Sequence, residues 1–149
     1  PPRSTLFPYT TLFRSDLYRT IRELRHGADL YQPGFIDDAD LPALFSAATA
    51  FLWPSLMEGF GLPPLEAMAC GTPVITSNTS SIPEVTGKAA LLIDPTDESA
   101  MTEAILELAG DERLQQALSE AGRLQAESFT WAHTAQLTLA AYRDVLNAG

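Results

Sequence analysis

Two glutamates on either side of a glycine-containing loop form the segment of this sequence best suited to chemistry on a ligand. Glu58 and Glu66 lie eight residues apart, with Gly59 and Gly61 between them. Glycine lets the backbone approach a ligand closely and adopt dihedral angles closed to other residues. Carboxylates are good acceptors for hydrogen bonds from paired sugar hydroxyls. The pattern therefore indicates a ligand that presents hydroxyl groups to both glutamates.

The loop leads into a predicted helix, which adds a place for a phosphate between the two glutamates. Pro64 suits the first turn of a helix that continues from Leu65 to Cys70, and Gly71 is a typical residue at a helix C-terminus. The free amides and the positive dipole end of a helix N-terminus hold anions. An anion site flanked by hydroxyl acceptors matches a nucleoside diphosphate sugar, in which a diphosphate joins a ribose to a hexose.

Each glutamate also has a simpler structural interpretation when it is taken alone. Glu66 falls in the first turn of the predicted helix, where the helix dipole favours any carboxylate. Glu58 can equally be a solvated loop residue. The complete string from Glu58 to Glu66, placed after a buried strand, is much more specific than either glutamate.

An apolar run just before the loop predicts the strand that positions it. Ala50 to Trp53 is uniformly apolar and is ended by Pro54, a pattern typical of a fully buried strand in a parallel sheet. Ligands of open parallel sheets bind at the carboxyl ends of the strands, where this loop begins. Further short strands are predicted at Leu30–Ile36, Pro73–Thr76 and Ala89–Ile93.

Helices are predicted between and after these strands, and the alternation indicates an α/β fold with a parallel sheet. The spacing of Leu17, Ile21 and Leu24 predicts a first helix. Ser81 and Glu84 form a capping box that predicts another. The remaining helices are predicted from candidate N-cap residues, which are Asp40, Thr96 or Asp97, Asp111 and Thr130.

The composition is that of a globular, acidic domain. The chain has 149 residues, of which 46% are hydrophobic and 19% charged, and its formal net charge is −10. This charge argues against nucleic acid as a partner. No apolar run reaches the roughly 18 residues that a transmembrane helix needs. The single cysteine, Cys70, fits a reducing compartment. We interpret Trp53 and Trp131 as core residues.

The first fifteen residues differ in character from the rest of the chain. Thr5-Leu6-Phe7 recurs as Thr11-Leu12-Phe13, and the segment lacks the pattern of a signal peptide. We interpret residues 1–15 as a non-native or artefactual segment, with a natural loop as the alternative. Residues 16–149 are then expected to form a partial nucleotide-sugar-binding domain.

The segment from Glu58 to Glu66 resembles the E-x7-E motif of retaining GT-B glycosyltransferases of the group-one kind. These enzymes include bacterial mannosyltransferases, glycogen synthases and sucrose synthases. The resemblance extends over about Leu30 to Leu146. It implies a partial, doubly wound, Rossmann-like parallel sheet of a GT-B C-terminal domain, followed by C-terminal helices. It also implies that the two central strands and an acceptor-binding N-terminal domain lie outside this chain.

The resemblance implies a role for each part of the loop. Glu58 would contact the donor hexose and act in catalysis, the backbone near Leu62 and the helix after it would face the diphosphate, and Glu66 would accept hydrogen bonds from the ribose. The turn around Phe35 would lie near the base. The implied donor-binding residues are Glu58, Gly59, Phe60, Gly61, Leu62, Pro63, Pro64, Glu66 and Phe35.

The function implied by the resemblance is transfer of a hexose, with mannose favoured, from a nucleotide diphosphate sugar to an acceptor with retention of configuration. GDP-mannose is the first expectation for the donor, and UDP-glucose remains open. The acceptor would be a glycan or a lipid-linked sugar bound through the N-terminal domain, in polysaccharide biosynthesis. The expected location is cytoplasmic or peripheral to the inner face of the membrane, and this chain alone is expected to be inactive.

The sequence also leaves two alternative functions open and contains one possible metal-binding pair. The chain can be a non-catalytic nucleotide-sugar-binding α/β module, or part of another GT-B enzyme such as a sugar epimerase. Asp38-Ala39-Asp40 formally matches the metal-binding D-x-D pair of the other glycosyltransferase fold, but Asp40 is better placed as a helix cap. We therefore expect no metal and no cofactor beyond the nucleotide-sugar substrate.

Overall fold

The computed structural model describes residues 19–20, 23, 30–31 and 33–147, which belong to two units, Pro1–Ile36 and Asp37–Gly149. In the first unit, Arg19, Thr20 and Glu23 are helical. They fall within the first predicted helix, of which Leu17, Ile21 and Leu24 lie outside the described residues. The proposed non-native segment, residues 1–15, also lies outside them.

The strand predicted at Leu30–Ile36 is wrong for the part of it that is described. Residues 30–31 and 33–36 have no strand structure, and Leu30, Tyr31 and Phe35 are exposed. A strand is stable only where its backbone groups pair with a neighbour. The apolar pattern of this segment predicted burial, but no pairing partner for it is present among the described residues.

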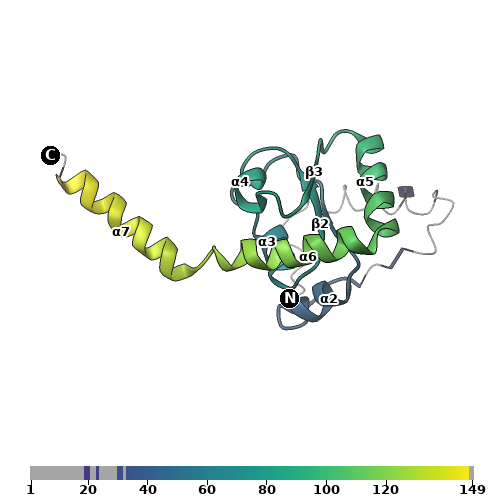
Figure 1. Ribbon diagram of the computed structural model, residues 1–149, viewed down its shortest axis with the longest axis horizontal. Helices are drawn as coiled ribbons and strands as arrows, with labels where there is room; N and C mark the ends of the chain where they lie inside the picture. Colours follow the sequence, from purple (N-terminus) through teal and green to yellow (C-terminus); the bar gives the residue numbers. More distant parts are fainter. Residues whose placement is uncertain (1–18, 21–22, 24–29, 32, 148–149) are drawn as a thin grey trace. The chain divides into compact units, whose positions relative to one another are not determined.

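The second unit is built on a three-stranded parallel sheet with the order β1-β2-β3. Figure 1 labels β2 and β3, with α4 and α5 nearby. The strands are β1 (Phe51–Trp53), β2 (Val74–Ser77) and β3 (Leu91–Ile93), close to three of the predicted runs. Leu52 is paired with Ile75, and Thr76 with Leu92. The parallel strands are joined by α3 (Leu62–Ala69) and α4 (Ile82–Thr86). The predicted α/β class and parallel sheet are confirmed.

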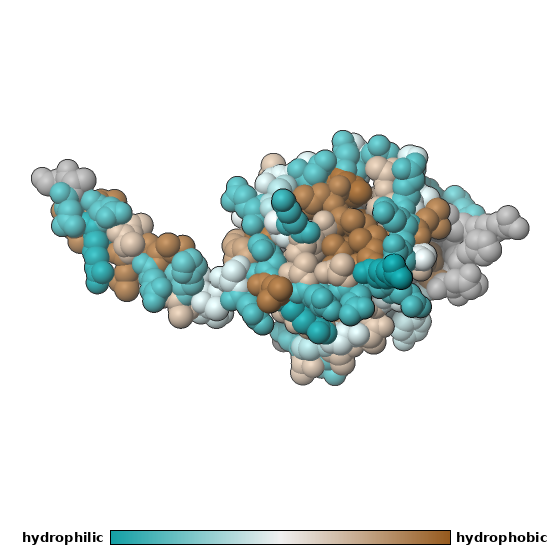
Figure 2. Space-filling model, in the orientation of Figure 1, coloured by the Kyte–Doolittle hydropathy of each residue, from teal (hydrophilic) through white to brown (hydrophobic). Residues whose placement is uncertain are grey.

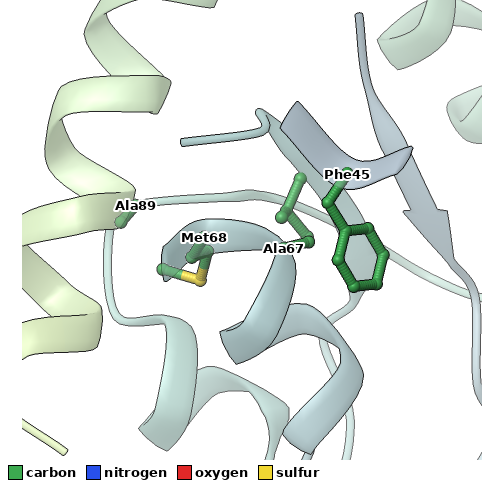
Figure 3. Close-up of a cluster of buried hydrophobic side chains, with 5 residues drawn as sticks. Phe45, Ala67, Met68 and Ala89 are labelled. Atoms are coloured by element: carbon green, nitrogen blue, oxygen red, sulfur yellow. The ribbon is translucent and has the colours of Figure 1, made fainter. Parts of the chain in front are cut away.

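The hydrophobic core lies on both faces of this sheet, because neighbouring residues of a strand point to opposite sides. Val74 belongs to one cluster and Ile75 to the other. The members of the first cluster that Figure 3 labels come from α2 (Leu41–Ala47), α3 and the segment before β3. The second cluster joins the sheet to α5 (Glu98–Gly110) and α6 (Glu112–Glu127). Of the three strands in the described residues, only β2 is buried at every position. Leu52 of β1 is exposed, so β1 is not the fully buried strand that was predicted.

The N-terminal starts of most helices were predicted correctly from their capping residues. The Asp97 carboxylate accepts hydrogen bonds from two amides at the start of α5, and Asp111 does the same for α6. The Thr130 hydroxyl accepts one from the His133 amide at the start of α7 (Trp131–Asn147). Asp40 is at the N-cap position of α2, but its side chain makes no capping hydrogen bond. Two of the three aspartates therefore cap their helices as carboxylates do elsewhere.

Gly71 ends α3 in the way its residue type predicts. Its φ of 78° lies in the left-handed region, which is open to glycine at little cost. The Thr72 amide donates to the Ala67 carbonyl at 3.0 Å and the Gly71 amide to the Met68 carbonyl at 2.9 Å. These two bonds form a Schellman motif, which satisfies carbonyls at the end of the helix.

The last helix, α7, differs from α2 to α6 because it has no buried residue. The prediction that Trp131 belongs to the core is wrong, since 86% of its surface is exposed. Figure 2 shows apolar surface along this helix, and its exposed apolar residues are Trp131, Leu137, Leu139, Tyr142, Val145 and Leu146. None of the helices in the described part of the chain is long and apolar enough to cross a membrane.

Candidate functional site

The candidate site begins at the carboxyl end of β1, which is held in place by aromatic packing and by hydrogen bonds. Phe51 and Trp53 are two residues apart and therefore share a face of the strand. Their rings stack with centroids 5.8 Å apart, and Phe51 meets Phe45 of α2 edge to face at 5.1 Å. The Trp53 carbonyl accepts hydrogen bonds from the Thr76 hydroxyl at 2.7 Å and the Ser55 amide at 2.9 Å.

Glu58 is the most firmly held residue of the loop that follows. Its carboxylate Oε1 accepts a hydrogen bond from the indole Nε1 of Trp53 at 2.7 Å. Its amide donates to the Ser80 hydroxyl oxygen at 3.0 Å, and its carbonyl accepts from the Ser81 hydroxyl at 3.0 Å. By contrast, Met57 beside it is 82% exposed. Glu58 is thus not the simple solvated loop residue of the alternative interpretation.

Ser81 does not cap α4 with its side chain, contrary to the predicted capping box. It occupies the N-cap position, but its hydroxyl makes no capping bond. Instead the hydroxyl bonds the carbonyls of Glu58 and Phe60, at 3.0 and 2.9 Å. The helix starts where it was predicted, while the serine ties the β2–α4 loop to the candidate site.

Gly61 is the residue that turns the loop into α3. Its φ of 109° lies in the left-handed region, and a Cβ at this position would lie 2.8 Å from Cδ1 of Ile82. The helix begins at Leu62, earlier than predicted. Pro63 and Pro64 are the next two residues and have no amide hydrogen. The Leu62 amide is therefore the one donor that the first three helical residues offer to an anion.

Glu66 lies in the second turn of α3, so its predicted place in the first turn is wrong. Its side chain is exposed and lines an open cavity of about 480 Å³. The other residues that line this cavity are Asp38, Leu41, Pro42, Phe45, Ala69 and Cys70. The wall of the cavity is thus largely apolar and comes mainly from α2 and α3, and the carboxylates of Asp38 and Glu66 also line it. Cavities of roughly 300–1,000 Å³ with this composition are typical of small-molecule sites.

The structure does not place all of the predicted site residues in one cavity. Glu66 lines the cavity, whereas Glu58 and the loop from Gly59 to Leu62 do not. Phe60 of that loop meets Phe129, between α6 and α7, edge to face at 5.8 Å. Phe35 belongs to the first unit and is 82% exposed, and its role near the base stays a prediction.

Sequence reasoning missed the residues that hold Glu58. Trp53 was interpreted as a core residue, and Ser80 was given no role. Ser80 has a φ of 52°, in the left-handed region that residues with a side chain rarely adopt. No local pattern announces a contact between residues 22 positions apart, such as that between Ser80 and Glu58. The Trp53–Glu58 contact spans only five residues. A loop has no regular spacing from which the hydrogen-bond partner of an indole could be predicted.

The Asp38–Asp40 pair divides between two structural roles. Asp38 lines the cavity beside Glu66, and Asp40 is at the N-cap position of α2. Within the described ranges, no group of three or more histidine, cysteine, aspartate or glutamate residues is arranged to hold a metal ion.

Comparison with known proteins gives the family context of this site. The model of the family described as glycosyl transferases group 1 matches residues 14–125. O-antigen chain mannosyltransferase B of Escherichia coli is 44% identical over 110 residues, which are 74% of this chain and 29% of that protein. The MMP alpha-(1->4)-mannosyltransferase of Mycolicibacterium hassiacum is 35% identical over 132 residues, or 86% of this chain and 32% of that protein. The chain therefore spans about a third or less of the length of these relatives.

Solved structures agree with the sequence relatives. Sucrose-phosphate synthase from Thermosynechococcus elongatus matches 93% of this chain and 35% of its own, with a TM-score of 0.81 and 31% identity. The C-terminal domain of a glycosyl transferase group 1 family protein from Francisella tularensis matches 82% of this chain and 64% of its own, with a TM-score of 0.69 and 25% identity. The resemblance predicted from the segment between Glu58 and Glu66 is confirmed.

Proposed function

This chain belongs to the group 1 glycosyl transferases, and on that premise we propose that it forms part of the donor-binding half of a hexosyltransferase. The donor is a nucleotide diphosphate sugar, with GDP-mannose first and UDP-glucose second. Mannose is favoured because the sequence relatives include mannosyltransferases of Escherichia coli and Mycolicibacterium hassiacum. The acceptor is a glycan or a lipid-linked sugar, met at the cytoplasmic side of a membrane.

The observation that carries the proposal is the position of Glu66 at the cavity between α2 and α3. The apolar side chains of Leu41, Pro42 and Phe45 offer a surface for a nucleoside. The Glu66 carboxylate lies at the same cavity and is suited to accept hydrogen bonds from two neighbouring ribose hydroxyls. In this proposal the nucleoside occupies the cavity, and the diphosphate leads from it toward the N-terminus of α3.

The hexose is assigned to the loop before α3, where Glu58 is held in place. The Leu62 amide and the dipole of α3 are suited to the diphosphate, because a helix N-terminus attracts anions. Glu58 then accepts hydrogen bonds from the hexose hydroxyls. Gly59 and Gly61 leave the backbone open to close approach on that side.

The transfer that we propose proceeds with retention of configuration on one face of the sugar. The bond between the anomeric carbon and the diphosphate oxygen breaks, and the acceptor oxygen bonds to the same carbon from the same face. The acceptor proton passes to the departing phosphate oxygen. Donor-site residues contribute by holding the hexose and the diphosphate in the reactive geometry, an effect that can lower a barrier substantially.

Thermal unfolding with and without ligands tests the proposal on the 149-residue chain. GDP-mannose, UDP-glucose, GDP and UDP are the four probes. A ligand present at about 100 times its dissociation constant adds about 2.7 kcal/mol to the free energy of unfolding. We expect GDP-mannose and GDP to raise the melting temperature more than the uridine probes. A cooperative melt that none of the four nucleotides shifts would overturn the proposal.

A further inference from the structure

We propose that Trp53 is a positioning residue for the donor sugar, which orients the Glu58 carboxylate before the sugar arrives. This inference rests on the proposed function, because it assigns the hexose to Glu58. It adds a role for an aromatic side chain that sequence reasoning had placed in the core. The geometry that carries it is the hydrogen bond of 2.7 Å from the indole Nε1 to Oε1 of Glu58.

The indole leaves half of the carboxylate available to a ligand. Oε1 is used by Trp53, whereas Oε2 accepts no hydrogen bond from any residue in the described part of the chain. A carboxylate has about four lone-pair positions on its two oxygens. Oε2 therefore keeps its full capacity to accept hydrogen bonds from sugar hydroxyls.

The indole N–H of Trp53 is chemically suited to orienting the Glu58 carboxylate. An indole N–H only donates and does not titrate. A lysine or arginine in its place would neutralise the carboxylate, whereas the neutral indole holds Glu58 and leaves its negative charge in place. That charge strengthens hydrogen bonds from hydroxyl groups, because hydrogen bonds to ionised acceptors are the stronger ones.

The indole is itself fixed in place, so that it can orient its partner. Its ring stacks on Phe51, which meets Phe45 at right angles in the core. The strand end that carries it is fixed by the Thr76 hydroxyl at the Trp53 carbonyl, at 2.7 Å. The orientation of the carboxylate is thus set by the hydrophobic core through one aromatic side chain.

The backbone of Glu58 is held as well, by two serines from the loop after β2. The Glu58 amide bonds Ser80 and its carbonyl bonds Ser81, each at 3.0 Å. Ser80 adopts a left-handed φ of 52°, and such strained residues persist where the surrounding structure holds them and cluster at functional sites. Three contacts from two other segments therefore converge on a single glutamate. Ordering this side chain in advance removes an entropy cost that binding would otherwise include.

The test compares two single substitutions of the same kind, Trp53→Phe and Trp131→Phe. The chain has two tryptophans, and Trp131 is exposed on α7. Phenylalanine at position 53 keeps a ring against Phe51 but removes the indole donor. Calorimetric titration gives the dissociation constants of GDP-mannose and of GDP, which lacks the hexose. We expect the preference for GDP-mannose over GDP to fall about tenfold in Trp53→Phe, because a misoriented Glu58 would lose about one hydrogen bond from the hexose to its charged carboxylate. The preference should stay unchanged in Trp131→Phe.

A spectroscopic measurement on the unsubstituted chain covers the case in which Trp53→Phe does not fold. Two indole ¹H–¹⁵N signals are expected, one from each tryptophan. GDP-mannose should shift the Trp53 signal strongly, GDP should shift it much less, and Glu58→Gln should move it without any ligand. The Trp131 signal should not respond in any of these experiments.

The possible failures are distinguishable. If the chain binds GDP-mannose and GDP but their ratio is the same in Trp53→Phe, or the Trp53 indole signal ignores both Glu58→Gln and the hexose, the positioning role is overturned while the donor site stands. If the unsubstituted chain binds neither nucleotide, the proposed function falls, and the role of Trp53 falls with it.

Discussion

Gly61 is a single residue on which the path of the loop into α3 depends. Its φ of 109° is unfavourable for any residue with a side chain, and an added Cβ would lie 2.8 Å from Cδ1 of the buried Ile82. We expect Gly61→Ala to lower the free energy of unfolding by about 1–3 kcal/mol, since a strained backbone position costs that much. Urea unfolding measures the difference.

Gly59 provides the matched control for that substitution. A Cβ at Gly59 would meet nothing within 4 Å, and its φ is not in the left-handed region. Gly59→Ala should therefore leave the urea midpoint nearly unchanged. Equal midpoints for the two alanine variants would show that Gly61 is not required for the turn.

Asp94 gives the chain a predictable response to pH. The side-chain hydroxyl and the backbone amide of Thr96 donate hydrogen bonds to its carboxylate and lower the pKa of Asp94 below its ordinary value. A lowered pKa in the folded state means that these bonds stabilise the fold above the pKa of the unfolded chain. That contribution is lost as the pH falls through the folded pKa. Carboxyl-carbon NMR titration should show a higher pKa in Thr96→Val, and an identical pKa would contradict the assignment.

At this scale the sequence predicted binding roles for two glutamates but not the residues that hold them. Glu58 and Glu66 stand out because type, spacing and position after a strand agree. The contact of Ser80 with Glu58 forms only when the loops after β1 and β2 meet, and that of Trp53 depends on how the loop after β1 folds back on the strand. Ser81 matched a local capping pattern, yet its hydroxyl is used in a tertiary contact, which competes successfully with the local one.

Among the helices, the N-cap aspartates allow a direct comparison of similar residues. Asp97 and Asp111 each accept two amide hydrogen bonds, whereas the Asp40 side chain accepts none at its own helix. We expect Asp97→Ala and Asp111→Ala each to lower the free energy of unfolding by about 1 kcal/mol. Asp40→Ala should lower the free energy of unfolding by only a few tenths of a kcal/mol. Thermal or chemical unfolding of the three variants measures this, and a loss for Asp40→Ala as large as the other two would contradict the capping account.

The strands show which elements can be predicted from their own residues. The region around β2 was predicted from its apolar run, and the strand that forms there is buried at every residue. The segment Leu30–Ile36 also carries apolar residues and was predicted as a strand, but its described residues form none. Sheet formation depends on a partner strand as much as on propensity. The composition of a segment therefore predicts the tendency to form a strand, and the rest of the sheet decides whether it does.

At the scale of the whole molecule, α7 stands out from α2 to α6 because it lacks buried contacts. None of its residues is buried, and in proteins most of the stability of a helix comes from tertiary packing of its apolar face. We expect the amides of α7 to exchange hydrogen much faster than those of α6, which carries the buried residues Leu118 and Gly122. Hydrogen exchange followed by mass spectrometry measures both helices in one experiment. Strong protection of α7 in the 149-residue chain would show that its apolar side chains are covered by another surface.

Periodicity and capping residues predicted the parallel sheet, its loop and most helix starts, because each depends on local chemistry. They did not predict the exposure of Trp131 and its helical neighbours. The apolar spacing of α7 is that of a buried helix, and the sequence does not specify the surface that would bury it. Amphipathic spacing predicts that a face can be buried, whereas its actual environment depends on the complete assembly.

The central claim, that the cavity between α2 and α3 binds the nucleoside of a donor, is tested most directly by calorimetric titration of GDP-mannose and GDP into Glu66→Ala. Glu107→Ala, an exposed glutamate on α5, is the matched control. Both ligands contain the ribose, so we expect both dissociation constants to rise about tenfold or more in Glu66→Ala, as for the loss of hydrogen bonds to a charged acceptor. Glu107→Ala should bind both ligands like the unsubstituted chain. Unchanged binding of both ligands by Glu66→Ala would contradict the account and place the nucleotide elsewhere.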